Sequence, residues 1–352
     1  MEPDFLPEND EIRVKPRPDC PVCGSSGAAL HKNWRDRILN IPGSWTWKRC
    51  FNKKCCTVWQ DPVVIEQDLP KLYVNYPTHN TASDPLPYAG LLQRVRDAVR
   101  DSYLHRAYQY PSQLPSWIRS FLYYIACVHI AWKDTQAASI FYLPFKRGGV
   151  VLDVGCGNGS SLKALERRGW KGVGIDFDES AISIARAKGL EVYAGDLQSQ
   201  SFPASSFDAV IMNHVVEHVP APYELLQECK RVLKKDGILI AITPNAASRG
   251  HEKYGSHWRG YEPDHLQLYT PASLHMLGAG FGFTRVETFS SLQGVNYLLD
   301  SSENLSHQKE PEPRAIKGFI PKLRHQARWL FLGLLHQFSP GRDEVAVLRC
   351  VK

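Results

Sequence analysis

The sequence lacks the features of a membrane-spanning or secreted chain. No window approaches the run of about 20 apolar residues that a transmembrane helix needs. Residues 1–15 contain several acids and no apolar core, unlike a secretory signal peptide. We therefore expect a cytoplasmic protein, in which the nine cysteines indicate reduced thiols or metal ligands rather than disulfides.

The excess of basic over acidic residues is small, and there is no internal repeat or low-complexity tract. A net charge of +6 permits contact with nucleic acid or an anionic surface but demands neither. The chain has 352 residues, of which 43% are apolar, so it can fill a sizeable core and is long enough for two or three modules.

The most informative segment is residues 150–159, which read Val-Val-Leu-Asp-Val-Gly-Cys-Gly-Asn-Gly. Apolar residues around one acid, Asp153, predict a buried strand. The strand runs into three glycines spaced by single residues, where backbone can approach a ligand closely because glycine has no Cβ. A dinucleotide-binding turn would read Gly-x-Gly-x-x-Gly. Because the third glycine comes one residue early, we expect a tighter loop and no pyrophosphate.

Acids end the next two predicted strands. Residues 172–176 end in Asp176, which is placed to accept both ribose hydroxyls of a nucleotide, and residues 191–197 contain Asp196. A fourth strand is predicted over residues 207–214, with a helix opening at 215–219, and a fifth strand over 237–245. An aspartate after a strand also commonly caps a helix, so the ordered series carries more weight than any single acid.

This series resembles the class I S-adenosylmethionine (SAM)-dependent methyltransferases, a Rossmann-like α/β family. The resemblance implies a mostly parallel seven-stranded sheet with an antiparallel last strand, and residues 281–288 and 344–349 match its last two strands. It implies SAM as the cofactor, with the adenine amino group bound by Asp196. The residues assigned to the cofactor are Asp153, Gly155, Cys156, Gly157, Asp176, Phe177, Asp196, Leu197, Asn213 and His214.

The chain divides into three expected parts. Residues 17–64 form a cysteine-bearing module, and residues 85–146 form a helical connector or cap. Residues 147–352 form the methyltransferase domain, with an insert at 289–343 between the last two strands. Within the connector, residues 116–143 predict a long aromatic-rich helical stretch whose apolar face packs on the catalytic sheet.

Four cysteines in the first module have the spacing of a zinc site. Cys20 and Cys23 form a Cys-x2-Cys knuckle, and Cys50 and Cys55 follow as a looser pair. Two thiolate pairs can build a closed tetrahedral site for structural Zn²⁺, as in zinc ribbons. The run resembles bacterial methyltransferases with an N-terminal zinc-binding module. Such modules often have glycine at the place of Cys56, so we choose Cys55 as the fourth ligand.

Four tryptophans and several basic residues in this module permit a second interpretation. Trp34, Trp45, Trp47 and Trp59 are of the type that stacks on bases, while neighbouring lysines and arginines contact phosphates. Aromatic residues in so small a module more often form its core. Nucleic acid is therefore a possible partner but not the favoured one.

The acceptor is expected beside the segment after the fifth strand, because ligands bind beyond the carboxyl ends of parallel strands. Residues 251–266 hold an unusual density of His, Trp, Arg, Tyr and Glu, which is not the composition of a core. An oxygen or nitrogen acceptor loses a proton, and a neutral histidine suits that step. Our first candidate for this base is His265 and our second is His257. The alternative is that His265 has a structural role.

Glu217 and His218 raise a further metal hypothesis. Ubiquinone-pathway O-methyltransferases have a similar Glu-His-Val, with another acid three residues earlier, and that cluster has been linked to a divalent ion. Here the earlier position is His214, so the set is His214, Glu217 and His218. We favour structural and SAM-lining roles for these residues.

The sequence thus predicts a SAM-dependent methyltransferase that methylates the oxygen or nitrogen of a small-molecule or glycan-type acceptor. The alternatives are an RNA methyltransferase that uses the zinc module to bind its substrate and a non-catalytic SAM-binding scaffold. The insert at 289–343 is basic and then apolar. It predicts a homodimer contact or a cover over the active site in preference to a peripheral membrane contact.

Overall fold

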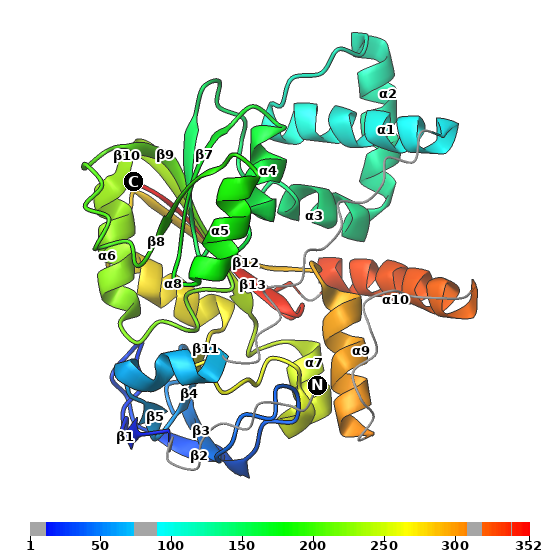
Figure 1. Ribbon diagram of the computed structural model, residues 1–352. Coiled ribbons are helices and arrows are strands. Elements are labelled where there is room, and N and C mark those ends of the chain that lie inside the picture. Colours follow the sequence, from blue (N-terminus) through cyan, green and yellow to red (C-terminus); the bar gives the residue numbers. More distant parts are fainter. Residues whose placement is uncertain (1–11, 74–89, 308–318, 339) are drawn as a thin grey trace, which may run out of the picture.

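A seven-stranded sheet forms the centre of the computed structural model, which describes residues 12–73, 90–307, 319–338 and 340–352 (Figure 1). Its strands are β6 (Val150–Val154), β7 (Lys171–Asp176), β8 (Glu191–Ala194), β9 (Phe207–Asn213), β10 (Leu233–Pro244), β12 (Arg285–Ser291) and β13 (Val345–Val351). They lie in the order β12-β13-β10-β9-β6-β7-β8. β13 runs antiparallel to both of its neighbours, and the pairs from β10 to β8 are parallel. The predicted Rossmann-like sheet with an antiparallel last strand is confirmed.

The central strands are buried on both faces, so their side chains alternate between two cores. On β9, Ala209 and Ile211 contact one core, whereas Val210 and Met212 contact the other. Near-continuous apolar runs of this kind are typical of parallel strands covered by helices on both sides. The covering helices are α4 (Ser160–Glu166) and α5 (Glu179–Ala187) on the first face, and α6 (Pro222–Val232) and α8 (Pro271–Ala279) on the second.

The N-terminal module is built from short antiparallel strands. β1 (Val14–Lys15) pairs with β5 (Val63–Val64). A separate sheet has the order β11-β4-β3-β2, with β2 (Gly27–Trp34), β3 (Trp45–Cys50), β4 (Val58–Gln60) and β11 (Gln267–Leu268). β11 lies about 200 residues after β4 in the sequence and belongs to the catalytic part. The N-terminal module and the catalytic part therefore share one sheet.

The tryptophans of this module are core residues. Trp34 and Trp45 are 7% and 3% exposed, and Trp47 and Trp59 are fully buried. Trp34 and Trp47 pack edge to face, as Trp47 does with Tyr261 of the catalytic part. A ring that is covered on all sides cannot stack on a base, so the base-stacking role considered for these four residues is wrong.

The connector contains three helices, α1 (Leu91–Tyr108), α2 (Ser116–Val128) and α3 (Ile130–Ala138). The single long packed stretch predicted over residues 116–143 is wrong in two respects. His129 adopts an extended backbone, and its Nδ1 accepts a hydrogen bond from the Trp132 N–H, so it ends α2 and caps α3. Within this stretch the part from Ala137 to Leu143 packs into the core beside the sheet, whereas α2 leaves several aromatic rings exposed. Residues 85–89 of the expected connector lie outside the described residues.

No helix opens at 215–219, contrary to expectation. The chain makes a turn there, and α6 begins at Pro222. Val219 and Ala221 each precede a proline, and a residue before proline is driven away from the helical region by clash with the proline ring. His214 at the start of this turn has a φ of 57°, a left-handed conformation rare outside glycine.

The expected insert at 289–343 contains α9 (Val295–Ser306) and α10 (Phe319–Phe338), which lie beside each other away from the sheet (Figure 1). Residues 308–318 and 339 of the insert lie outside the described residues. Among the helices that the structure describes, none is long and apolar enough to cross a bilayer.

Candidate cofactor and acceptor site

The glycine turn after β6 is closed by its own hydrogen bonds. Gly155, Gly157 and Gly159 have φ values of 75°, 51° and 75°, which favour glycine at all three positions. The N–H groups of Gly155 and Cys156 donate to the Ile175 carbonyl at 2.8 and 3.0 Å, and Gly157 N–H donates to Asp176 Oδ2 at 2.7 Å. A phosphate-binding turn would present these N–H groups to its ligand. The loop instead suits a ligand without phosphate, as its glycine spacing predicts.

The turn has open space on the side of Gly157. A Cβ built on Gly157 meets no atom within 4 Å, so the turn faces open space. Asp176 ends β7, and its two carboxylate oxygens are held by the N–H groups of Gly157 and Asp178. A carboxylate fixed at the end of the second strand is placed to accept ribose hydroxyls.

Two buried oxygens at the same edge have no hydrogen-bond partner among the described residues, namely Asp153 Oδ2 and Asn213 Oδ1. Orphaned buried polar atoms are rare and mark places where a ligand supplies the partner. Asp153 is 2% exposed, and burial together with the charge of Asp176 raises its pKa to about 8. Its carboxyl is therefore largely protonated at neutral pH and can donate a hydrogen bond.

The remaining residues predicted to bind the cofactor differ in exposure. Phe177 is 77% exposed at the end of β7 and presents a free ring face. Asp196 is exposed, but its carboxylate already accepts the Ser199 N–H at 2.6 Å, as a turn-capping aspartate does. Cys156 and Leu197 are buried in the cores beside the sheet, so only their backbone can contact a ligand.

A compact group of acids and histidines lies beyond the end of β9. It comprises Glu217, His218, Glu262, Asp264 and His265, and we call it the acid–histidine cluster. Ligating atoms of Glu217, His218 and His265 lie within 4.8 Å of one another, as do those of Glu262, Asp264 and His265. The rings of His218 and His265 pack edge to face at 4.6 Å. All five residues are buried or nearly so.

Hydrogen bonds fix the tautomer of His265. Its Nδ1 lies 2.8 Å from the Gly260 carbonyl oxygen, which can only accept, so Nδ1 carries the proton. In the neutral ring Nε2 is then an acceptor. His218 Nδ1 lies 3.3 Å from Asp264 Oδ2 and 3.1 Å from the Tyr73 hydroxyl.

The charges of the cluster balance internally. Burial lowers the pKa of His218, yet the charges of Asp264 and Glu217 outweigh it and raise that pKa to about 9. Burial likewise raises the pKa of Glu217, but the His214 hydrogen bond and the neighbouring histidine charges hold it at about 2. Glu262 pairs with Arg259. The residues can coordinate a divalent ion through Glu217, His218 and His265, although these ion pairs satisfy the charges without one.

The raised pKa of His218 makes stability depend on pH. Because the folded-state pKa lies near 9 and the unfolded value near 6.5, the stabilisation is complete below pH 6.5 and is lost as pH rises through 9. The free energy of unfolding should fall by about 3 kcal/mol across this window. Denaturant titration should show this slope in the wild type and a flatter profile in His218→Gln. Equal slopes in the two proteins would contradict the assignment.

The segment expected to lie beside the acceptor is mostly buried, so the inference that its composition is not that of a core is wrong. Trp258 and Tyr261 are 1% and 0% exposed, and Trp258 Nε1 donates to Glu344 at 2.9 Å. Polar and aromatic residues serve here as core because most of their polar groups have a hydrogen-bond partner, while Asp264 is paired through its charge with His218. The segment begins with α7 (Arg249–Tyr254) and the short helix η3 (Gly255–His257).

The structure separates the two histidines considered as bases. His265 belongs to the acid–histidine cluster, whereas His257 ends η3 and lies outside that cluster. His214 Nδ1 lies 3.1 Å from Glu217, so it joins the edge of the cluster.

Three residues that the sequence analysis did not single out support the cluster. Asp264 is the acid beside His265 and the ion-pair partner of His218. Gln60 of β4 donates to the carbonyl oxygens of Pro263 and His265 at 2.9 and 3.0 Å, and Tyr73 reaches His218. The adjacency of Asp264 to His265 was a readable signal, whereas Gln60 and Tyr73 are about 200 and 145 residues from their partners and gave none.

The four cysteines predicted to bind zinc meet at the border of the module. Cys20 and Cys55 sulfurs lie 3.7 Å apart, Cys23 and Cys50 sulfurs lie 3.4 Å apart, and all four lie within 4.8 Å of one another. A tetrahedral site with Zn–S bonds of about 2.3 Å separates its sulfurs by about 3.8 Å, so the donor set fits zinc. Cys56 lies outside this group. Its backbone has a φ of 55°, and its thiol donates a hydrogen bond to the Lys53 carbonyl oxygen.

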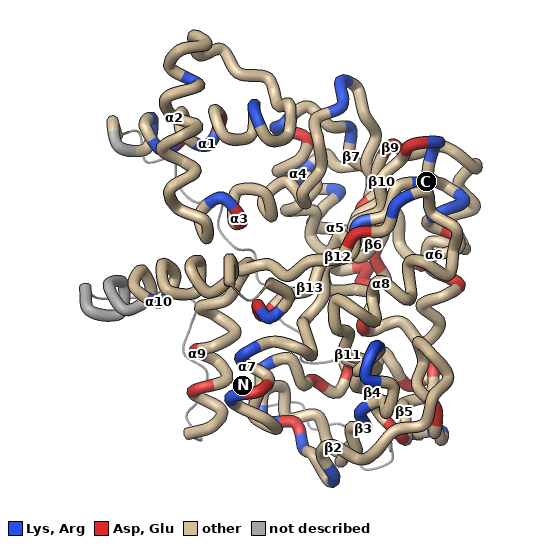
Figure 2. Tube along the Cα trace, turned by 180° about the vertical axis from the view of Figure 1, so that it is seen from behind, with Lys and Arg blue, Asp and Glu red and all other residues tan. Residues whose placement is uncertain are grey.

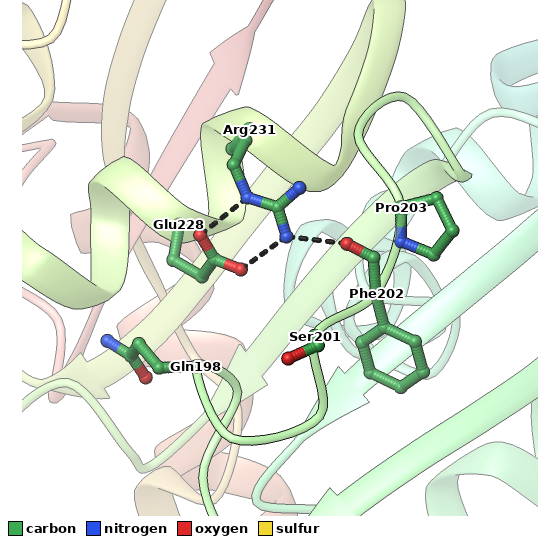
Figure 3. Close-up of a pocket in the computed structure, with 6 residues that line it drawn as sticks. All are labelled: Gln198, Ser201, Phe202, Pro203, Glu228 and Arg231. Carbon is green, nitrogen blue, oxygen red and sulfur yellow. Dashed lines mark hydrogen bonds and ion pairs between the residues drawn. The ribbon is translucent and has the colours of Figure 1, made fainter.

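A surface cavity of about 440 Å³ is lined by none of the residues predicted to bind the cofactor, acceptor or metal (Figure 3). It is lined by Gln198, Ser201, Phe202, Pro203, Glu228 and Arg231. Arg231 donates to both Glu228 oxygens and to the Phe202 carbonyl, so its charge is already paired. The cavity therefore offers little to a charged ligand and does not compete with the edge of the sheet.

Comparison with known proteins identifies a shared region. Residues 132–288 match the family model described as "Methyltransferase domain". The ubiquinone biosynthesis O-methyltransferase of Hahella chejuensis is 37% identical over 131 residues, which is 35% of this chain and 52% of that protein. The protein of the same name from Actinobacillus pleuropneumoniae is 33% identical over 115 residues, covering 30% and 49%. The chain thus spans about half the length of these curated relatives.

Among solved structures, a SAM-dependent methyltransferase from Archaeoglobus fulgidus aligns with a TM-score of 0.43 at 20% identity. The alignment covers 65% of this chain and 100% of that one.

Proposed function

We propose that this chain, whose residues 132–288 match the methyltransferase-domain family model, is a class I SAM-dependent methyltransferase that transfers a methyl group to a hydroxyl group of a small molecule. The observation that carries the proposal is the glycine turn with Asp176 fixed beside open space, one strand away from the acid–histidine cluster. The O-methyltransferase names of the relatives support an oxygen acceptor.

The cofactor would be held at the edge of β6, β7 and β9. Asp176 would accept the ribose hydroxyls, Phe177 would cover one face of the base, and the orphaned oxygens of Asp153 and Asn213 would meet polar groups of the ligand. Asp196 and His214, with the backbone of Gly155, Cys156, Gly157 and Leu197, would complete the site. When bound, the cofactor supplies an electrophilic methyl group to an acceptor that the site must position in line.

His265 would take the proton of the acceptor. In the neutral ring its Nε2 is the acceptor because Nδ1 donates to the Gly260 carbonyl, and Gln60 holds the backbone of His265. The proton taken up would lie next to Glu217, whose low pKa keeps it negative. Ligating atoms of Glu217 and His265 lie within 4.8 Å of each other, and a carboxylate this close stabilises an imidazolium.

We propose structural Zn²⁺ on Cys20, Cys23, Cys50 and Cys55. The ion would hold together a module over residues 17–64 that shares a sheet with the methyltransferase domain at 147–352, and residues 85–146, of which the structure describes 90–146, would be the helical connector. A closed four-thiolate site has no open position for catalysis. The cytoplasmic location expected from the sequence would keep these thiols reduced.

The proton-acceptor role predicts a selective loss of turnover in His265→Gln. Removing a general base costs about 100-fold or more in kcat, whereas SAM affinity should change less than about threefold. Formation of S-adenosylhomocysteine with a panel of small phenols and alcohols provides the assay. His257→Gln is the matched control, because His257 lies outside the cluster, and it should keep wild-type turnover.

Full turnover in His265→Gln would exclude the base role. Tight SAM binding without turnover on any acceptor would favour the non-catalytic scaffold, and methylation of RNA alone would favour the RNA alternative.

A further inference from the structure

Helix α2 presents an apolar face to solvent. Its exposed residues are Trp117 (73%), Phe121 (64%), Tyr124 (65%), Ile125 (46%) and Val128 (85%). They recur at intervals of three and four, so they lie along one side of the helix. Scattered apolar residues are normal on a protein surface, but a continuous stripe of this size marks an interaction site.

Helix α10 carries a second stripe. Leu330, Phe331, Leu334 and Phe338 are 53%, 60%, 55% and 81% exposed. Its other side is packed, since Leu332 is 9% exposed and contacts Ala131, Leu292 and Val295. The exposed stripe is therefore not a face that the described fold uses.

The two stripes are neighbours. The rings of His129 and Trp329 lie 5.2 Å apart, which sets α10 against the junction between α2 and α3. Gly333 also lies against Ala131, since a Cβ built on it would meet that residue at 3.3 Å. In Figure 1 both helices extend beyond the sheet on the same side of the molecule. We call the two stripes together the α2–α10 surface.

Positive charge is concentrated around this surface. The described side chains of α1, α2, α3 and α10 include seven Lys or Arg and three Asp or Glu, a net charge of +4. The neighbouring α9 adds two acids, Asp300 and Glu303, and both pair with Arg328 of α10. Neither α2 nor α10 contains an acid, and both are free of red segments in Figure 2.

We propose that the α2–α10 surface docks on an anionic lipid bilayer, with the two helices lying in its interface. Amphipathic helices bind this way when an apolar face is flanked by basic residues, and tryptophan and tyrosine favour the interfacial region. The negative surface potential of such a bilayer complements the charge of these helices. This inference does not depend on the proposed methyl transfer.

Two other occupants fit less well. A second copy of the chain would oppose this surface to itself across a twofold axis, so basic helices would face basic helices. Single-stranded RNA would use the aromatic rings but would gain little from Ile125, Val128, Leu330 and Leu334, because aliphatic side chains offer no stacking face.

Vesicle flotation of the full chain tests the proposal. We expect binding to phosphatidylcholine vesicles that contain about 30 mol % phosphatidylglycerol, and weak binding to phosphatidylcholine alone. Phe121→Ser and Phe331→Ser should each reduce binding about tenfold. Phe51→Ser is the matched control, since Phe51 is 64% exposed on the N-terminal module, and it should bind as the wild type does.

Several results would overturn the proposal. These are absence of wild-type protein from the floated anionic vesicles, binding that neither helix variant weakens, and an equal loss in Phe51→Ser. A dimer in sedimentation velocity that Phe121→Ser or Phe331→Ser dissociates would assign the surface to a second copy. Affinity for oligouridine that the same variants reduce, without vesicle binding, would assign it to nucleic acid.

Discussion

Cys55→Ser should release the zinc ion and uncouple the N-terminal module from the acid–histidine cluster. Changes in residues that only orient metal ligands cost about 10–100-fold in affinity, so loss of a ligand should cost more than about 100-fold. The Cys55 carbonyl accepts a hydrogen bond from Thr270 at the start of α8, and β4 pairs with β11 two residues after His265. Weakening of these contacts between the module and the catalytic part should therefore lower turnover more than about tenfold. SAM affinity should stay within about threefold of the wild-type value, because the glycine turn and Asp176 are unchanged.

Cys56→Ser provides the matched control for this prediction. It changes the adjacent thiol, which lies outside the group of four sulfurs, and should keep about one zinc per chain and full turnover. Zinc content by mass spectrometry, SAM titration and S-adenosylhomocysteine formation give the three readouts. Retention of zinc in Cys55→Ser together with its loss in Cys56→Ser would reverse the assignment of the fourth ligand.

Asp176→Ala should abolish measurable SAM binding. The carboxylate is placed to accept two ribose hydroxyls, and a hydrogen bond to a charged group contributes about 1.5–3 kcal/mol, so the loss should exceed about 100-fold in affinity. The same oxygens hold the N–H groups of Gly157 and Asp178, so the glycine turn also loses its anchor. Calorimetric titration with SAM and S-adenosylhomocysteine measures the effect.

Asp178→Ala separates cofactor binding from local stability. Asp178 lies two residues away and caps α5 through the N–H groups of Ser180 and Ala181, so its loss should cost about 1 kcal/mol of stability. SAM affinity should be unchanged. If the two variants weaken SAM binding equally while both remain folded, the specific role of Asp176 is wrong.

The sheet and the glycine turn could be read from the sequence because their signals are local. Each apolar run of strand length lies within about ten residues of the glycines or the acid that end it, which is the range that such patterns report. Cys55 could be chosen over Cys56 by resemblance, and the left-handed backbone of Cys56 gives a physical reason for glycine at that place.

The acid–histidine cluster could be read only in part because it depends on long-range packing. His265 was singled out, but its partners come from β4, η1 (Glu66–Tyr73) and the turn after β9. The dense aromatic and polar composition of residues 251–266 suggested exposure, whereas a second module covers it and pairs its polar tips. The break at His129 was missed because its cap is a histidine rather than the serine, threonine or aspartate that marks most helix starts.

The strand pairing of β4 with β11 also dictates the order in which the molecule can be assembled. Trp59 lies opposite Gln267, so about 200 residues must follow it before the sheet of the N-terminal module has its fourth strand. At translation rates of about 5–20 residues per second, that interval is about 10–40 s. During it, Trp59 and the edge of β4 lack their final cover, so this module is completed only after most of the central sheet has been synthesised.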